Sequence, residues 1–287
     1  MTTERLSQGS GAGKLVLGTV QFGCRYGINS AGRPGENDVR DILRRAADEG
    51  ISLLDTSSAY GDAEQVLGRC IGGSSPFGIV SKYPAGYGKV EDVFRATLHR
   101  LGTDRLYGYL LHHFSVFREN PAVWDDFRRI RESGLCRKIG FSLYEPEELE
   151  IILDSKVDFD LLQIPRNVFD RKFDPYLAQL NGRGVEIHVR STFLQGLFFK
   201  DRDTLPEKLL PLRPYLLQLD EFAAENGMSM AQLALGYNIG NPYINGVLIG
   251  VDNVEQLMAN VQAAVITDVK PDIRVKEEYL LSPVNWQ

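Results

Sequence analysis

Eight short apolar runs, rich in Val, Ile, Leu and aromatic residues, recur along the chain between Gly, Pro or polar residues. Such bounded runs are typical of buried parallel strands. They cover residues 14–23, 50–56, 77–83, 106–113, 137–144, 159–165, 185–193 and 244–251. Segments with the apolar period of amphipathic helices lie between them, and several end in Gly, a common helix stop. The clearest are residues 36–50, 90–102, 122–134 and 145–155. The pattern predicts eight strands alternating with helices.

Eight strand-helix repeats within 287 residues, without a linker-like break, predict one closed (β/α)8 barrel. A Rossmann domain would need the spacing GxGxxG after the first strand, and residues 17–27, LGTVQFGCRYG, do not supply it. We expect residues 1–13 to be a flexible lead and residues 14–287 to form the barrel. Residues 202–240 contain more helical pattern than one repeat needs, which predicts extra helical structure between the seventh and eighth strands. The last six residues would be a tail.

Composition and charge narrow the class of partner. The chain is 43% hydrophobic and 24% charged, as in ordinary globular proteins. A net charge of -6, with no Lys/Arg block, argues against nucleic acid or acidic membrane as a partner and favours a small molecule. Cys24, Cys70 and Cys136 are widely separated and outside any CxxC pattern, which predicts neither disulfides nor a metal site. With no signal-like or membrane-spanning run, we expect a cytoplasmic protein.

Polar residues follow the predicted strands. All strand carboxyl ends of a parallel barrel open on one face, where catalytic groups collect. The candidates in chain order are Gln21, Asp55, Tyr60, Lys82, His112, His113, Ser142, Gln163, Asn167, Arg190, Ser191 and Asp252.

Four of these candidates suggest a specific chemistry. An unperturbed Tyr titrates near ~10, so Tyr60 needs a neighbouring cation to release a proton at neutral pH, and Lys82 can be that cation. Asp55 would keep Lys82 charged in a partly dry pocket. His112 can donate a hydrogen bond to the carbonyl oxygen that Tyr60 protonates. The set suits reduction of a carbonyl by hydride.

The same residues carry a family resemblance. Residues 14–265 resemble the aldo-keto reductases, whose Asp, Tyr, Lys and His are matched by Asp55 and Tyr60 in LDTSSAYG, Lys82 in IVSKY and His112 in YLLHH. The step from Asp to Tyr has the family's spacing, and GDAEQVLGR is similar to the usual continuation. The resemblance implies a (β/α)8 barrel that binds NADPH or NADH across its mouth without a metal, with Tyr60 as general acid.

The resemblance also implies a set of cofactor-binding residues. Ser142 and Gln163 match positions that hold the nicotinamide carboxamide. Gly18 and Thr19 match the turn after the first strand, beside the cofactor. Ser191 and Gly196 match the loop over the pyrophosphate. The segment that holds the adenosine end is matched by Gly250, Gln256 and Asn260.

Three positions depart from the family pattern. Leu143 replaces a common Asn that contacts the carboxamide. Arg190 stands where many members stack an aromatic ring on the nicotinamide, and a guanidinium can also stack there. Asp252 replaces the Arg, Lys or Ser that meets the 2′-phosphate of NADPH. A carboxylate there would repel the phosphate, which favours NADH or dual cofactor use.

Loop residues above the four-residue site are the substrate candidates. Aromatic rings could form a wall, and the arginines could receive a phosphate or carboxylate or could instead face solvent or cofactor. The candidates are Phe22, Tyr26, Tyr83, His113, Phe114, Arg166, Arg190 and Phe193. LGTVQFGCRYGIN and HVRSTFLQGL resemble a bacterial branch associated with sugar or surface-polysaccharide biosynthesis, so we expect a polar, sugar-like aldehyde or ketone.

Other interpretations remain open from the residues alone. Asp55 could be a turn residue and Lys82 a surface charge, although their conjunction with Tyr60 and His112 favours a site. A cofactor-binding regulatory or redox-sensing subunit is one alternative, because the beta subunits of some potassium channels resemble reductases. A lyase or isomerase with Lys82 as a Schiff base is another.

Overall fold

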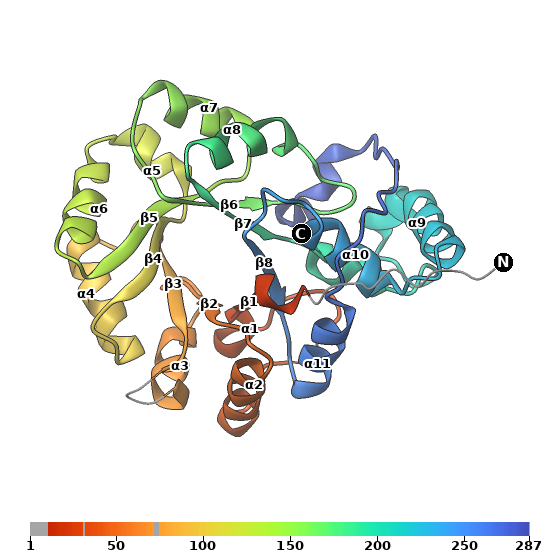
Figure 1. Cartoon of the computed structure of the whole chain (residues 1–287), viewed down its shortest axis with the longest axis horizontal. Coiled ribbons are helices and arrows are strands. Elements are labelled where there is room, and N and C mark those ends of the chain that lie inside the picture. The colour runs from red at the N-terminus through yellow and green to blue at the C-terminus, as the bar shows by residue number, and fades with distance from the viewer. Residues whose placement is uncertain (1–10, 31, 72–74, 287) are drawn as a thin grey trace.

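Eight parallel strands pair in sequence order, and β1 also pairs with β8, so the sheet closes into a barrel (Figure 1). The computed structural model describes residues 11–30, 32–71 and 75–286. The strands are β1 (Leu15–Gly18), β2 (Leu53–Asp55), β3 (Gly78–Tyr83), β4 (Leu106–Leu111), β5 (Cys136–Ser142), β6 (Leu161–Pro165), β7 (Glu186–Arg190) and β8 (Gly246–Gly250). Each lies within one of the eight predicted runs except that β5 begins one residue earlier, so the predicted (β/α)8 barrel is confirmed.

Helices surround the barrel (Figure 1). They are α1 (Val20–Gly23), α2 (Glu36–Asp48), α3 (Ala63–Ile71), α4 (Val90–Leu101), α5 (Phe114–Glu119), α6 (Val123–Glu132), α7 (Pro146–Asp154), α8 (Leu177–Gly182), α9 (Arg213–Glu225), α10 (Met230–Ile239) and α11 (Val254–Ala263). Gly102 ends α4 in the left-handed conformation, as its sequence position predicts. No helix in the described ranges is long and apolar enough to cross a membrane.

The connection from β7 to β8 carries the predicted extra helical structure. It contains α9, α10 and two 3-10 helices, Leu194–Phe199 and Glu207–Leu212. Leu216 on α9 and Leu233 on α10 are fully buried in a second apolar cluster beside the barrel. The C-terminal segment joins this cluster through Leu280, whose carbonyl accepts a hydrogen bond from Trp286 Nε1 at 2.8 Å. The tail therefore packs against the inserted helices.

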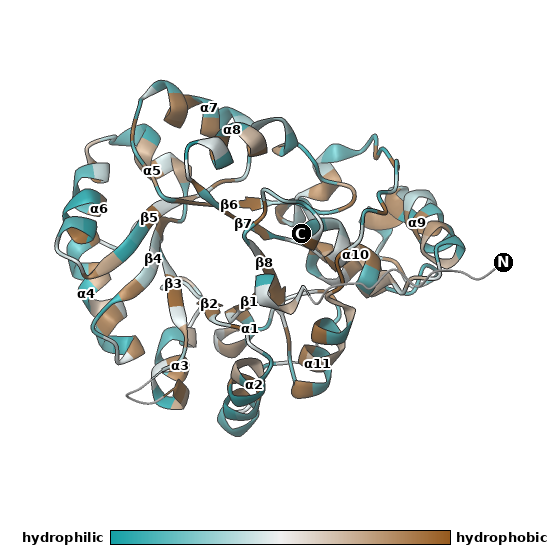
Figure 2. Ribbon diagram, in the orientation of Figure 1, coloured by the Kyte–Doolittle hydropathy of each residue, from teal (hydrophilic) through white to brown (hydrophobic). Residues whose placement is uncertain are grey.

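The main core lies between the strands and the outer helices, where Leu54, Tyr109 and Phe141 are fully buried. The strands β6 and β7 are largely brown in the hydropathy view, while α4 and α6 alternate teal and brown (Figure 2). This is the expected pattern for barrel strands that are buried on both faces and covered on the outer face by amphipathic helices. The core leaves the carboxyl ends of the strands free to carry polar groups.

The N-terminal boundary can be followed only from Gly11, because residues 1–10 of the predicted lead lie outside the described residues. Gly11 N donates to Ala264 O at 2.8 Å. A 3-10 helix, Ala12–Lys14, then leads into β1, and Lys14 Nζ donates to Ile239 O at 2.9 Å. These contacts anchor the chain at the barrel from Gly11 onward.

Candidate active site

A cavity of about 440 Å³ opens where the carboxyl ends of β1, β2, β6, β7 and β8 meet. Its volume lies in the range of small-molecule sites. The predicted site residues that line it are Gly18, Thr19, Gln21, Tyr26, Asp55, Tyr60, Gln163, Arg190, Ser191, Phe193, Gly196, Gly250, Asp252, Gln256 and Asn260. Lys82, His112 and Ser142 are buried next to lining residues, since Lys82 contacts Asp55, His112 contacts Tyr60 and Ser142 pairs with Gln163. Most of the sequence-predicted site is thus brought to one place.

Lys82, Asp55 and Tyr60 form a compact buried group. Lys82 Nζ lies 2.6 Å from Asp55 Oδ1 and 3.4 Å from Tyr60 Oη, and it donates to the Thr56 carbonyl at 2.9 Å. The side chains of Lys82 and Asp55 are 0% and 3% exposed. They come from the neighbouring strands β2 and β3, which fix their separation through the sheet register. Tyr60 lines the cavity, and its hydroxyl contacts the buried ammonium group of Lys82.

Burial dominates the electrostatics of the group. Burial lowers the pKa of Lys82, while the Asp55 charge and hydrogen bond act in the opposite direction. Burial also raises the pKa of Tyr60 well above its usual value; the Asp55 charge adds to this and the Arg190 charge opposes it. The net direction of this pKa change is upward, opposite to the one expected from Lys82 alone, because burial is the largest cause and the Asp55 charge adds to it. Tyr60 holds its proton, as a general acid must before reaction.

His112 lies edge-on to Tyr60, with ring centroids 5.7 Å apart. Burial, with a contribution from the Lys82 charge, lowers the pKa of His112 to about 2, so the imidazole is neutral. Its Nδ1 lies 3.1 Å from Ser57 Oγ. If the Ser57 hydroxyl donates to Nδ1, the ring proton is on Nε2 and is available for a carbonyl oxygen. His113 stacks on His112 but is exposed, and its Nδ1 accepts from Ala85 N.

Two polar residues support Asp55. Gln163 Nε2 donates to Asp55 Oδ2 at 2.8 Å, and Thr19 Oγ1 donates to the Asp55 carbonyl at 2.9 Å. Ser142 pairs with Gln163 in the register of β5 and β6. The Gln163–Asp55 hydrogen bond could not be predicted from the sequence, because the two residues are 108 positions apart and only the closed barrel brings them together.

The comparison with known proteins decides the family. Residues 14–274 match the model of the aldo/keto reductase family. The chain belongs to the aldo-keto reductases. It is therefore an NAD(P)H-dependent oxidoreductase. Its match to this family covers all eight strands and the residues described above.

Relatives and solved structures agree with this assignment. This reductase is 24% identical over 283 residues to an uncharacterized oxidoreductase of Bacillus subtilis, covering 88% of this chain and 89% of the relative. It is 26% identical to the L-glyceraldehyde 3-phosphate reductase of Escherichia coli K12, covering 78% of each. An aldo-keto reductase from Bacillus halodurans in its holo form has a TM-score of 0.73 at 21% identity, covering 93% and 90% of the two chains. The Klebsiella pneumoniae aldo/keto reductase in complex with NADP and acetate has a TM-score of 0.67 at 21% identity, covering 94% and 90%. The structural matches show the same fold.

Arg190 of the reductase makes contacts that the sequence did not suggest. Its guanidinium stacks on the ring of Tyr144, 4.0 Å from the centroid, and Nη2 donates to the Leu143 carbonyl at 3.0 Å. Leu143 itself is fully buried and turns its backbone, not a side-chain amide, toward the site. The end of β7 is thereby joined to the end of β5. Tyr144 could have been noticed as an aromatic residue following a strand.

The loop after β7 is held in an unusual backbone conformation. Ser191, Leu194 and Gln195 have φ values of 62°, 47° and 52°, in the left-handed region that L-residues rarely adopt. The side chain of Asn167 fixes this loop by donating to the Ser191 carbonyl at 3.1 Å. Ser191 therefore lines the cavity on a strained, externally braced turn.

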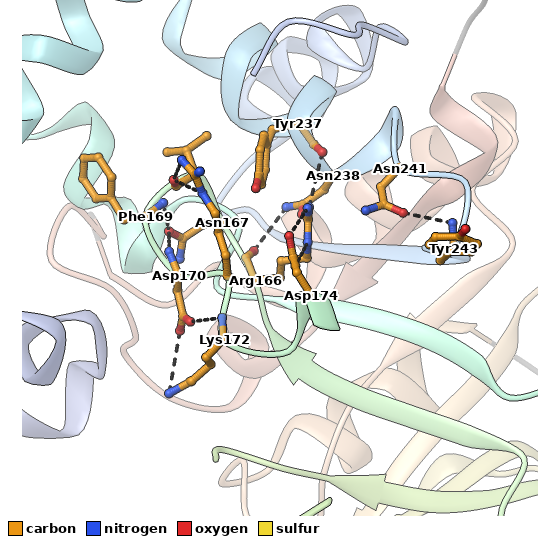
Figure 3. A network of polar contacts seen from close by, with 12 residues as sticks. Arg166, Asn167, Phe169, Asp170, Lys172, Asp174, Tyr237, Asn238, Asn241 and Tyr243 are labelled. Atoms are coloured by element: carbon orange, nitrogen blue, oxygen red, sulfur yellow. Dashed lines mark hydrogen bonds and ion pairs between the residues drawn. The ribbon is translucent and has the colours of Figure 1, made fainter. Parts of the chain in front are cut away.

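Four predicted substrate residues are wrong, because they are buried away from the cavity. Phe22 is fully buried in the main core, because the short helix α1 turns it away from the cavity. Arg166 is 2% exposed and is committed to an internal network (Figure 3). It pairs with Asp174 at 2.7 Å and donates to Asn238 Oδ1 at 2.7 Å. Of the remaining candidates, Tyr83 and Phe114 are also buried in the core.

The predicted adenosine segment lines the other end of the cavity. Asp252 N donates to Gln256 Oε1 at 2.8 Å, and Asn253 caps the start of α11. The Asp252 carboxylate accepts from Ser30 Oγ at 3.3 Å. The described residues contain no cluster of three or more His, Cys, Asp or Glu side chains arranged to hold a metal.

Proposed function

We propose that this reductase transfers hydride from a nicotinamide cofactor to an aldehyde or ketone, with Tyr60 as the proton donor. The supporting observation is that the Tyr60 hydroxyl lies between the cavity and the buried Lys82–Asp55 pair, 3.4 Å from Lys82 Nζ. A Schiff-base lyase would need a neutral amine open to the cavity. Lys82 is fully buried and donates to Asp55 and Thr56, which opposes that alternative.

The cavity fits a nicotinamide cofactor. Gly18 and Gly250 are partners in the register of β1 and β8, so neither strand end carries a side chain at the rim. Gln21 Oε1 is buried beside them without a hydrogen-bond partner, as expected of an acceptor kept for a ligand amide. When bound, the cofactor supplies the hydride. The residues that would hold it are Gly18, Thr19, Ser142, Gln163, Ser191, Gly196, Gly250, Asp252, Gln256 and Asn260.

The proton path uses only protein groups. As charge develops on the carbonyl oxygen, the O–H bond of Tyr60 breaks and a new O–H bond forms on the substrate. The negative charge left on Tyr60 is stabilised by Lys82, which Asp55 keeps protonated against the effect of burial. A neutral His112 donates a hydrogen bond that orients the carbonyl. In this mechanism the Lys82–Asp55 ion pair is needed to stabilise the charge that forms on Tyr60.

We also propose that the cofactor is NADH or either dinucleotide. Asp252 lines the cavity, and a carboxylate there repels a 2′-phosphate but can accept a hydrogen bond from a ribose hydroxyl. The Klebsiella relative was solved with NADP, so the two cofactors have to be compared directly for this chain. Because of Asp252, we expect the dissociation constant for NADH to be no larger than that for NADPH.

For substrate we propose a polar, sugar-like carbonyl compound. Polar side chains near the mouth support this, since Asn29 and Gln195 line the cavity with Tyr26. The Escherichia coli relative is named for a three-carbon sugar phosphate. The test is a panel of sugar aldehydes, nucleotide-linked keto sugars and simple aldehydes, assayed by oxidation of NADH and NADPH. Turnover of sugar-like carbonyls is expected, and activity on aromatic aldehydes alone would oppose the proposal.

A further inference from the structure

Arg190 lies at the wall of the cavity and makes no ion pair among the described residues, although its charge acts on the buried carboxyl of Asp170. Among the described residues, its one hydrogen-bond acceptor is the Leu143 carbonyl. Its Nε is buried and has no partner. Arg166, by contrast, is satisfied by Asp174, Asn238 and the Tyr237 carbonyl (Figure 3). Arg166 therefore has a structural role, whereas Arg190 keeps donors that no other described residue uses.

A free, partly buried guanidinium is unfavourable unless something pairs with it. A donor that loses water without gaining an acceptor destabilises the protein, and more so when it is charged. Buried charges in proteins are accordingly paired or bind ligands. Arg190 lines the cavity, and the donors that a ligand there can reach are its terminal nitrogens, of which only Nη2 has an acceptor among the described residues.

The guanidinium is held ready for a planar anion. Stacking on Tyr144 at 4.0 Å and the hydrogen bond to Leu143 fix its plane and direction. A fixed guanidinium fork binds carboxylate or phosphate in a bidentate manner. Its charge also acts on the reaction centre, since it opposes the rise in the pKa of Tyr60 and lowers the pKa of His112. Anion site and proton donor therefore share one cavity.

We propose that Arg190 binds an anionic group, carboxylate or phosphate, on the carbonyl substrate. The proposal rests on the proposed function and narrows its substrate class to carbonyl compounds with a negative charge. Of the two roles that the sequence left open for Arg190, cofactor and substrate, the proposal takes the substrate. A cofactor phosphate as the occupant is the rival outcome of the test.

The test compares matched carbonyl pairs at saturating cofactor. Glyceraldehyde 3-phosphate is paired with glyceraldehyde, and succinic semialdehyde with butanal. In the wild-type protein, kcat/KM is expected to favour the anionic member of each pair by about tenfold or more. Arg190→Met should reduce that ratio to near one, mainly through KM of the anionic member. Arg190→Lys, which keeps the charge and loses the fork, should give an intermediate ratio.

Controls separate the charge from the fold and the cofactor. Arg44→Met, at a side chain that is 73% exposed on α2, should leave the ratio as in the wild type. Raising the salt concentration should lower the wild-type ratio, a measurement that does not depend on the folding of any variant. The dissociation constant of the cofactor, measured by fluorescence, should stay within about twofold in Arg190→Met.

Three results would overturn the proposal. Equal wild-type turnover of both members of each pair would remove the anionic substrate while leaving the reductase function intact. A tenfold weaker cofactor affinity in Arg190→Met, with equal loss for charged and neutral carbonyls, would assign Arg190 to the cofactor. No turnover of any carbonyl with either dinucleotide would contradict both this proposal and the proposed function.

Discussion

Lys82 and Asp55 form an ion pair that is shut off from water, with Nζ 2.6 Å from Oδ1 and side chains 0% and 3% exposed. The second carboxylate oxygen of Asp55 accepts from Gln163 Nε2. Because both charges are desolvated, each depends on the other to remain ionised. A change in the charge of either Lys82 or Asp55 should therefore alter both the stability of the protein and the charge state of the other residue.

Removing one member of the pair should destabilise the protein more than removing both. Lys82→Met leaves Asp55 as an uncompensated buried charge, and breaking such a pair costs about 3–5 kcal/mol. The double variant Asp55→Asn, Lys82→Met should recover much of that loss, while both variants lack carbonyl reduction. Urea unfolding and steady-state turnover check this. A double variant no more stable than Lys82→Met, or turnover retained without Lys82, would contradict it.

His112 should make stability depend on pH in mildly acidic solution. Its pKa is about 2 in the folded protein, against about 6.5 in an unfolded chain. The unfolded state therefore binds the extra proton, so stability is intact above pH ~6.5 and is lost progressively as the pH falls toward 2. Between about pH 6.5 and 5, His112→Gln should lower the slope of unfolding free energy against pH. His99→Gln is the matched substitution control, and identical slopes in His112→Gln and the wild type would refute the prediction.

Cofactor choice should respond to the charge of Asp252. The wild type should bind NADH at least as tightly as NADPH, and Asp252→Ser should shift the ratio of dissociation constants toward NADPH by about tenfold, near the effect of one charged contact. Ser30→Ala is the matched control, because it removes the hydrogen bond to Asp252 but keeps the carboxylate. Fluorescence titration with both dinucleotides measures the ratio. A clear NADPH preference in the wild type would oppose the assignment.

The strained turn at Ser191 should be separable from its hydroxyl. Glycine adopts φ near 62° without the penalty of a Cβ, so Ser191→Gly should be more stable than Ser191→Ala by about 1 kcal/mol. Both variants lose the hydroxyl and should weaken cofactor binding equally. Thermal unfolding and cofactor titration give the two readouts. Equal stability of the two variants would show that the turn is not strained.

The barrel could be predicted because its strands are bounded apolar runs with a regular helical spacing. Asp55, Tyr60 and Lys82 could be predicted for a related reason, since residues at or just beyond the carboxyl end of a strand in a parallel barrel meet at one face. Position along the chain was enough there, as neighbouring strands are also neighbours in sequence order.

Side-chain direction beyond a strand end could not be predicted in the same way. Phe22 follows β1, but the one-turn helix α1 rotates it into the core. Arg166 follows β6, yet its partner Asn238 is 72 residues away on an inserted helix that the apolar pattern does not position. Arg190 at the end of β7 contacts Tyr144 just after β5, and this contact too joins residues far apart in the sequence. Long-range contacts decided each of these cases.

Tyr60→Phe tests the central claim most directly, because it removes one oxygen from a side chain of nearly unchanged shape. With the carbonyl substrate that the wild type reduces fastest, kcat of the variant should fall by about 10²–10⁴-fold, the usual contribution of a general acid. Its cofactor dissociation constant, measured in the same preparation, should remain close to that of the wild type. A Tyr60→Phe variant that keeps most of the wild-type turnover would contradict the assignment of Tyr60 as the proton donor.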